Sequence, residues 1–275
     1  MTTDVNRRVL PGFSLALGYT LLYMSLLVAI PLGAGFLKAS HLSLDEFWAA
    51  VASDRALAAY RLTVGASLAS ATIDVAVGVL VAWVLVRYHF PLKGLLDSLV
   101  DLPFALPTAV AGLVYSDLFV ARGWYGRFLV PLGIQGAYSR LGIVLVLVFI
   151  GFPFVVRTLQ PVLESLDKDV EEAAACLGAN RLQTALRVIF PSILPAVVTG
   201  FALAFARSLG EYGSVVFVSG NMPYRTEIAP VLIVARLEEF AYTEATAIAV
   251  VLLAISFVTL FAINLLERWS KRHHG

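Results

Sequence analysis

Charged residues are scarce in this 275-residue chain. Asp, Glu, Lys and Arg make up only 14% of it, whereas 59% of the residues are hydrophobic. A soluble domain carries about a quarter charged residues, so water cannot be the main solvent of this surface. The mean hydropathy of +0.84 agrees, and we expect the apolar excess to face lipid. The 20 basic and 19 acidic residues nearly balance, which argues against nucleic acid as a partner, because that needs a clustered basic face.

Cysteine is almost absent as well. Because Cys176 is the only one, the chain can form neither an internal disulfide nor a cysteine-based metal site, and we expect Cys176 to be a small buried residue. The four histidines are scattered, without the His-Glu-x-x-His spacing of a zinc enzyme. The sequence has no Gly-Lys pair for a Walker A loop and no Gly-x-Ser-x-Gly elbow for an esterase-type nucleophile. We therefore predict no catalytic residue, metal site or cofactor in this chain.

Long apolar stretches are what the sequence does contain. Six of them are candidates for membrane-spanning helices, over residues 13–37, 62–86, 99–120, 141–156, 192–219 and 245–266. The third holds Asp101 and Asp117, and Pro103 and Pro107 are expected to kink it. The fourth is too short to span a bilayer unless its helix continues past Arg157. The Arg157 side chain could then extend along the helix to place its charge at the membrane surface. The pattern predicts an all-α membrane protein with six transmembrane helices.

Six spans place both termini on one side of the membrane. Lys and Arg residues near the span ends are more frequent on that side, which favours the cytoplasm for it. The chain then divides into a cytoplasmic N-terminus (1–12), a first transmembrane helix (13–37), a periplasmic amphipathic segment (38–60), a core domain (61–267) and a cytoplasmic tail (268–275). Within the amphipathic segment, Ser43 and Glu46 have the spacing of a capping box, which predicts a short helix at the outer interface.

The most charged stretch of the chain, residues 164–191, lies between the fourth and fifth spans. Asp169 and Glu172 have the spacing of a capping box for a first helix, and Gly178 is placed to end it in a left-handed turn. Asn180 can cap a second helix, and Pro191 is expected to stop it. The apolar face of the first helix is expected to comprise Val170, Ala173, Ala174 and Leu177. This pattern predicts a cytoplasmic helix–turn–helix suited to a groove on a partner.

The same stretch resembles a known element. Glu172, Ala173, Ala174, Gly178, Val188, Phe190 and Pro191 match the spacing of the EAA loop in permeases of ATP-binding-cassette (ABC) importers. The usual pattern ends in Ile-x-Leu-Pro, and Val188 and Phe190 replace the Ile and Leu with other apolar side chains. In that family the loop seats in a cleft of the cytoplasmic ATPase and couples it to the permease. The resemblance thus implies a type I ABC importer permease in a bacterial inner membrane.

Three further tracts narrow the resemblance. Residues 8–13 (RVLPGF), 208–221 (SLGEYGSVVFVSGN) and 226–264 resemble the CysT (CysU) type of sulfate/thiosulfate permease. That resemblance implies a second, CysW-like permease, two cytoplasmic ATPase subunits that bind ATP and Mg, and a periplasmic sulfate/thiosulfate-binding protein. Molybdate permeases share the Gly-Glu-aromatic-Gly and Gly-Asn pieces, so a molybdate or tungstate permease is the alternative. An ion channel or proton-coupled transporter is the alternative of another class, but it would have no use for an EAA loop.

Arg207 and Glu211 are charged residues inside the fifth predicted span. They lie four residues apart, so they can pair on one face of a helix. A charge at mid-bilayer costs about 2.5–3.5 kcal/mol on insertion scales, so neither is expected to face lipid. The pair either lines the translocation path or fixes helix packing, and the sequence leaves both open. Gly200, Gly210, Gly213 and Gly220 in the same span are expected to allow close packing.

Overall fold

The computed structural model of the chain describes residues 12–274, and every regular element in that range is a helix. Five helical segments are long and apolar enough to cross a membrane. They are Phe13–Ala39 (α1, Phe13–Met24; a π turn, Ser25–Ala29; α2, Ile30–Ala39), α4 (Asp54–Arg87), α9 (Arg140–Ser165), Arg181–Leu209 (α11, Arg181–Thr184; a π turn, Ala185–Ile189; α12, Phe190–Leu209) and the Tyr242–Leu265 part of α15 (Tyr242–His274). These agree with five of the six predicted spans.

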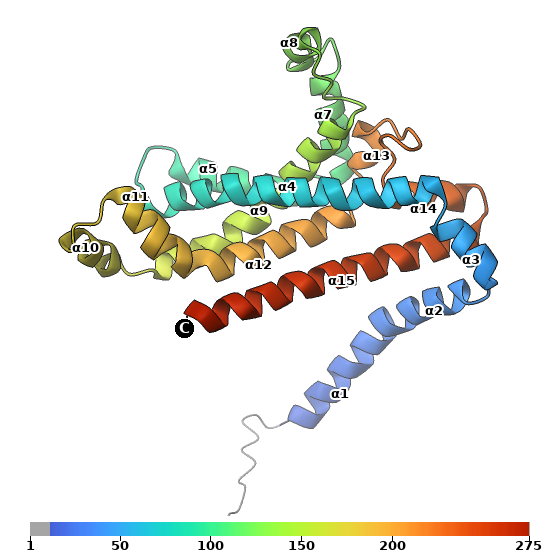
Figure 1. Cartoon of the computed structure of the whole chain (residues 1–275), viewed down its shortest axis with the longest axis horizontal. Coiled ribbons are helices and arrows are strands. Elements are labelled where there is room, and N and C mark those ends of the chain that lie inside the picture. The colour runs from blue at the N-terminus through green and yellow to red at the C-terminus, as the bar shows by residue number, and fades with distance from the viewer. Residues whose placement is uncertain (1–11, 275) are drawn as a thin grey trace, which may run out of the picture.

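The core lies where α4, α9 and α12 pack side by side, with α15 against α12 (Figure 1). Glycines allow close approach of these helices. A Cβ added to Gly78 of α4 would lie 2.7 Å from Val155 Cγ1 of α9, and one added to Gly200 of α12 would lie 3.2 Å from Val155 Cα. The predicted packing role is therefore confirmed for Gly200, whereas Gly210 faces open space. Phe205 and Leu159 are fully buried in this core.

A stripe of polar side chains runs through the same core on one face of α4. Thr63, Ser67, Ser70 and Asp74 recur at intervals of three and four residues, and all are buried. Ala229 N donates to Thr63 Oγ1 at 2.8 Å, and Ser70 Oγ lies 3.3 Å from Ser208 Oγ of α12. Asp74 points at Gly151 of α9, and its carboxylate oxygens have no hydrogen-bond partner in the described part of the chain. The stripe thus ties α4 to its neighbours by polar contacts as well as apolar ones.

The third predicted span, expected to be one helix kinked at Pro103 and Pro107, is broken into separate helices. Residues 93–119 instead form three pieces, α5 (Lys93–Val100), α6 (Leu102–Ala105) and α7 (Thr108–Phe119). Leu106 is extended because it precedes Pro107, which disfavours helical backbone at the residue before it. With α8 (Gly126–Leu129) and a 3₁₀ turn (Val130–Leu132), α7 projects sideways from the layer of long helices (Figure 1). Of this predicted span, only α7 is an apolar helix of intermediate length.

The fifth predicted span also ends earlier than expected. Helix α12 stops at Leu209, and the chain turns through residues 210–214 into the short helix α13 (Val215–Val218). The Glu211 carboxylate accepts a hydrogen bond from the Ser214 backbone N–H at 2.9 Å, and this bond stabilises the turn in place of a continued helix. A loop then leads to α14 (Ala229–Glu238). The predicted short helix after the first span is confirmed as α3 (Leu44–Val51), with both hydrogen bonds of the Ser43–Glu46 capping box present.

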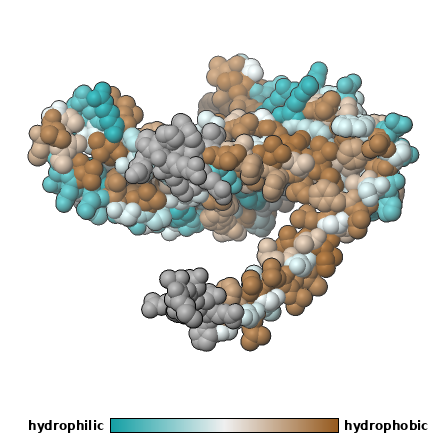
Figure 2. Space-filling model, turned by 60° about the horizontal axis from the view of Figure 1, so that its bottom comes forward, coloured by the Kyte–Doolittle hydropathy of each residue, from teal (hydrophilic) through white to brown (hydrophobic). Residues whose placement is uncertain are grey.

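Hydrophobic side chains cover much of the outer surface (Figure 2). They extend over α1–α2 and the middle of the long helices, while hydrophilic side chains gather toward the two ends of the molecule. In the most apolar stretch of Phe13–Ala39 no residue is buried within the chain. Such a surface is unstable in water, and it matches a protein whose solvent is lipid.

Gly112 of α7 lies against Ser214, the residue that precedes α13, and it provides a test of this packing. A Cβ at Gly112 would lie 2.8 Å from Ser214 Cα and overlap the Ser214 carbonyl. We expect Gly112→Ala to lower the free energy of unfolding by about 1–3 kcal/mol, as overpacked cores do. The measurement is the thermal midpoint of the purified chain in detergent. Gly33→Ala is the matched control, because Gly33 is also inside a helix but faces open space. Equal midpoints for the two variants would contradict the close contact.

Candidate functional site

The charged stretch forms a pair of helices at one end of the molecule (Figure 1). Helix α10 (Lys168–Cys176) ends at Gly178, whose φ of 83° is left-handed, as predicted. The Gly178 and Ala179 backbone N–H groups donate to the Ala175 and Ala174 carbonyls at 2.9 and 3.0 Å, so glycine closes a Schellman turn. The predicted Asn180 cap of the second helix, α11, is confirmed, and Gln183 completes its capping box.

Two predictions about α10 are wrong. Its N-cap is Asp167 rather than Asp169, and no side-chain hydrogen bond caps it, so Glu172 has no capping role. Of the expected apolar face, Ala174 is buried, whereas Ala173 is exposed and Leu177 is 89% exposed, so part of this face is open to a partner. Cys176, predicted to be buried, is exposed too. Val170, Leu177 and Leu182 on the helical pair, and Leu186 in the π turn that follows it, are exposed apolar side chains, and Glu172 is exposed as well.

Pro191 does not stop the second helix. The chain is helical without interruption from Arg181 to Leu209. A π turn over Ala185–Ile189 directly precedes Phe190 and Pro191. Proline has no backbone N–H and so cannot make one of the helical hydrogen bonds, and the π turn accommodates this missing bond. Val188 in this π turn is partly buried, and Phe190 at the start of α12 is 41% exposed. Residues Arg181–Leu209 thus form one helical rod of 29 residues, about 43 Å long at 1.5 Å per residue. The rod runs from the helical pair to the other half of the molecule.

One ion pair fastens α10 to the long helices. Arg87, the last residue of α4, lies 2.8 Å from the Glu171 carboxylate and donates to the Leu166 carbonyl at 3.1 Å. Its guanidinium also lies over the Trp83 ring, 5.5 Å from the centroid. The Arg87 side chain is only 11% exposed. Sequence reasoning missed this anchor, because two residues so far apart in the chain give no pairing signal beyond their opposite charges.

A second missed cluster surrounds Arg157. The α9 helix does continue past this residue, as predicted, but Arg157 is neutralised rather than left to snorkel. Its guanidinium donates to Asp97 at 2.7 Å and to Asp101 at 2.6 Å, so it ties α9 to α5 and to the turn after it. Gln160 donates to Asp97 at 3.0 Å, and this bond together with Arg157 holds the pKa of Asp97 below its ordinary value. Among the side chains that the structure describes, no group of three or more His, Cys, Asp or Glu could hold a metal ion.

The predicted Arg207–Glu211 pair is present at the far end of the rod. The two side chains form an ion pair, although Glu211 lies in the turn beyond α12 rather than inside the helix. Glu211 is almost fully buried and also accepts hydrogen bonds from the Ser214 N–H and hydroxyl at 2.9 and 3.0 Å. Arg207 keeps about a third of its side chain exposed. The pair thus joins the end of α12 to the start of α13, which packs on α7.

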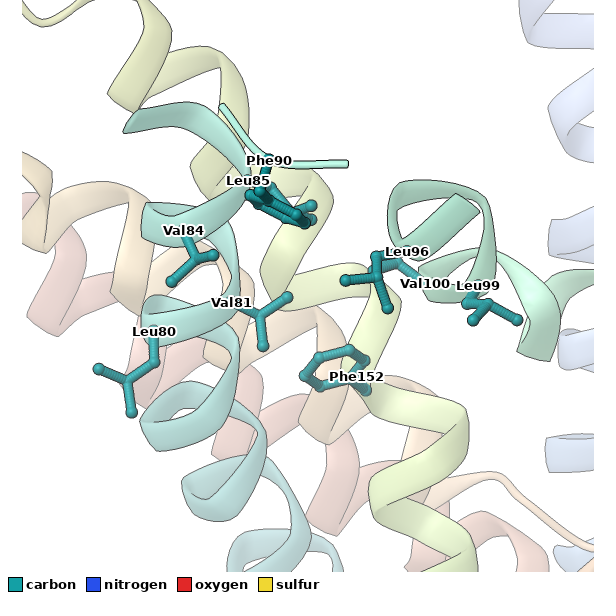
Figure 3. A pocket seen from close by; sticks show the side chains of 9 residues that line it. All are labelled: Leu80, Val81, Val84, Leu85, Phe90, Leu96, Leu99, Val100 and Phe152. Atoms are coloured by element: carbon teal, nitrogen blue, oxygen red, sulfur yellow. The ribbon is translucent and has the colours of Figure 1, made fainter. Parts of the chain in front are cut away.

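An apolar pocket of about 390 Å³ lies between α4, α5 and α9 (Figure 3). Its nine lining residues are all Leu, Val or Phe, with Phe152 of α9 facing Val81 of α4 across the space. Without a hydrogen-bond donor or a charge among these side chains, the pocket cannot replace the hydration shell of an ion. It is therefore not a site for an ionic substrate.

Residues 74–272, which include the helical pair, the rod and the charge pair, match the family of binding-protein-dependent transport system inner membrane components. The chain belongs to this family. It is 47% identical over 271 residues to the sulfate transport system permease protein CysT of Salmonella typhimurium, covering 98% of each chain. It is 51% identical over 257 residues to CysT of Synechococcus elongatus, covering 94% of this chain and 92% of that one.

Two solved structures share the fold. A bacterial ABC transporter for the acidic polysaccharide alginate superposes with a TM-score of 0.76 at 17% identity, covering 93% of this chain and 94% of that one. An inward-facing MetNI methionine transporter gives 0.60 at 15% identity, covering 83% and 99%. At such identities the likeness establishes the type I importer permease fold, and substrate has to be argued from other observations.

The Arg87 anchor predicts how firmly α10 is held. Arg87→Ala removes the bonds to Glu171 and Leu166, and we expect amide hydrogen exchange in residues 168–178 to become roughly tenfold faster, since a hydrogen bond to a charged group contributes about 1.5 kcal/mol or more. Arg181→Ala is the control, because Arg181 is exposed and forms no ion pair with a described residue. Unchanged exchange in Arg87→Ala would show that the ion pair does not hold the helix.

Proposed function

We propose that this chain is a membrane-spanning permease subunit of an ABC importer that moves sulfate into the cytoplasm. The observation that carries the proposal is its near full-length similarity to sulfate transport system permeases, at 46–51% identity in three bacteria. The helical pair supports it, because an element that exposes both acidic and apolar side chains suits docking into another protein. A channel or proton-coupled transporter would leave this element without a use.

The assembly we propose has this chain in a bacterial inner membrane with both termini in the cytoplasm. The third of the six spans would be the broken segment that ends in α7, so the count of six includes a crossing that is not one continuous helix. A second, CysW-like permease would complete the pore, and two ATPase subunits would bind ATP and Mg beneath it. A periplasmic sulfate/thiosulfate-binding protein would deliver the anion. One structural neighbour, an alginate ABC transporter, was solved in complex with a periplasmic protein bound to alginate pentasaccharide, which supports this arrangement.

Coupling would run along the rod. The ATPase would seat α10 and α11 through Glu172, Ala173, Val188 and the exposed apolar side chains nearby. Because α11 continues into α12 without a break, a displacement of the pair is passed to the Arg207–Glu211 turn about 43 Å away. There the Arg207–Glu211 ion pair would act as a positioning contact for α13 and α7. Movement of α13 and α7 would open or close the translocation path. Arg207 is already neutralised by Glu211, which suits brief contact with a passing anion better than tight binding.

The substrate is tested by uptake of labelled sulfate in a strain that lacks this chain, with and without the chain restored. We expect restoration to return uptake, excess thiosulfate to block it, and excess molybdate to leave it unchanged. Loss of molybdate uptake on deletion, with sulfate uptake intact, would contradict the sulfate assignment while leaving the permease fold untouched.

The coupling role is tested by charge reversal at Glu172 and by side-chain insertion at Gly178. Glu172→Lys and Gly178→Asp are expected to cut sulfate uptake and binding-protein-stimulated ATP hydrolysis by about tenfold or more, within the usual range of coupling energies. Gly178 has a left-handed backbone that a side chain strains. Membrane insertion should be unchanged on immunoblots. Glu164→Lys is the matched control, since Glu164 is exposed outside the helical pair. Normal transport by both test variants would show that this surface does not dock the ATPase.

A further inference from the structure

A second pocket, of about 500 Å³, lies at the start of α4 and differs in character from the apolar one. Ala58, Arg61, Leu62, Gly65 and Ala66 of α4, Arg140 and Val144 of α9, and Tyr224 line it. Two of these residues are basic and none is acidic. Neither Arg61 nor Arg140 forms an ion pair with a described carboxylate, in contrast to Arg207, Arg157 and Arg87. The pocket therefore holds positive charge that the described part of the chain does not neutralise.

The walls of this pocket are fixed rather than loose. Arg55, in the first turn of α4, forms two hydrogen bonds with the Glu227 carboxylate at 2.8 and 2.7 Å. The Met222 carbonyl accepts from the N–H groups of Arg225, Thr226 and Glu227, which folds residues 222–227 into a compact turn. Tyr224 sits in this turn with a left-handed φ of 64°, an uncommon backbone conformation for an aromatic residue.

Arg140 is oriented by the same turn. Its Nε donates to the Arg225 carbonyl at 2.8 Å, so one edge of the guanidinium is used. No hydrogen bond from its two terminal nitrogens to a described residue is present, so they can donate to a ligand in the pocket. Arginine is well suited to tetrahedral oxyanions because its planar group offers two parallel N–H donors.

The pocket lies on the opposite side of the membrane from the helical pair. Arg61 precedes Arg87, the anchor of α10, by 26 positions of one continuous helix, or about 39 Å. The hydrocarbon core of a bilayer is about 30 Å thick, so the two residues lie at opposite faces. If α10 faces the cytoplasm, the pocket opens toward the periplasm.

We propose that Arg61 and Arg140 form an outer receiving site, where a hydrated tetrahedral oxyanion rests before it enters the path across the membrane. This assignment rests on the proposed import of sulfate. A pocket of about 500 Å³ has room for many waters beside the anion, so the anion keeps much of its hydration shell and is held weakly. Weak holding suits a site that must also release its ligand, and the two charges raise the local concentration of anions.

The site is tested first without transport. Replacing Cys176 with Ser removes the only native thiol of this chain, and Gly65→Cys places a new one in the pocket, where a side chain meets open space; labelling is read on this chain alone, after separation from its partners. In the full complex in nanodiscs, a negatively charged methanethiosulfonate should react faster than a positively charged one. Arg61→Glu should lower that rate ratio by about tenfold, whereas Lys38→Glu, at the same end but outside the pocket, should not change it. Sulfate should slow the negative reagent in nanodiscs without anionic lipid.

Transport then separates this site from the proposed function. In proteoliposomes, Arg61→Glu should reduce sulfate uptake by about tenfold, Arg61→Lys should restore it, and ATP hydrolysis should stay near the wild-type rate. The receiving site would be overturned by any of three results. These are a labelling ratio that Arg61→Glu does not shift, full sulfate uptake by Arg61→Glu, or slowing of the negative reagent by anionic lipid but not by sulfate. A shifted ratio with sulfate protection, but no sulfate uptake by the wild-type complex, would keep the anion site and overturn the proposed substrate.

Discussion

The close packing of α4, α9 and α12 forms the centre of the molecule and positions the other helices. Lipid tails are as apolar as leucine, so the hydrophobic effect does not drive helices together in a bilayer, and close backbone approach has to do so. Gly78, Gly151 and Gly200 provide it, each at a point where an added Cβ would crowd the neighbouring helix. Helix α12 is held along this contact and is continuous with α11. The helical pair and the Arg207–Glu211 turn are therefore joined by one continuous helix.

The distribution of charge follows from the same solvent. Within the described residues, most basic side chains near the helix core have an acidic partner: Arg55 with Glu227, Arg87 with Glu171, Arg157 with Asp97 and Asp101, and Arg207 with Glu211. Removing one partner of such a pair would leave an uncompensated charge, which is costly away from water. Each pair also joins two elements, so neutralisation and tertiary contact are achieved together. Arg61 and Arg140 stand apart because their charge is directed into an open pocket.

Much of the fold could be predicted from the sequence, because apolar runs, helix caps and glycine turns are local signals. The five long helices, the Ser43 and Asn180 caps and the Gly178 turn are of this kind. The wrong predictions have two causes. A distant contact takes part in the break of the third span, because Arg157 of α9 holds Asp101 beside it. The fifth span ends in a local turn, in which the Glu211 carboxylate accepts from the Ser214 N–H, and the apolar run through residue 219 concealed this turn. The predicted stop at Pro191 is wrong because no local pattern indicates the π turn that accommodates it. The role of residues 172–191 in coupling stays a prediction.

Whether this chain passes sulfate only when an ATPase drives it can be measured as uptake of labelled sulfate by proteoliposomes. The vesicles would hold this chain with its partner permease and ATPase subunits, with ATP enclosed on the ATPase side and loaded binding protein on the other. We expect uptake that needs both ATP and the binding protein and stops when either is omitted. Uptake that continues without ATP would contradict it, because the chain would then conduct sulfate as a channel rather than as a permease driven through its α10–α11 surface.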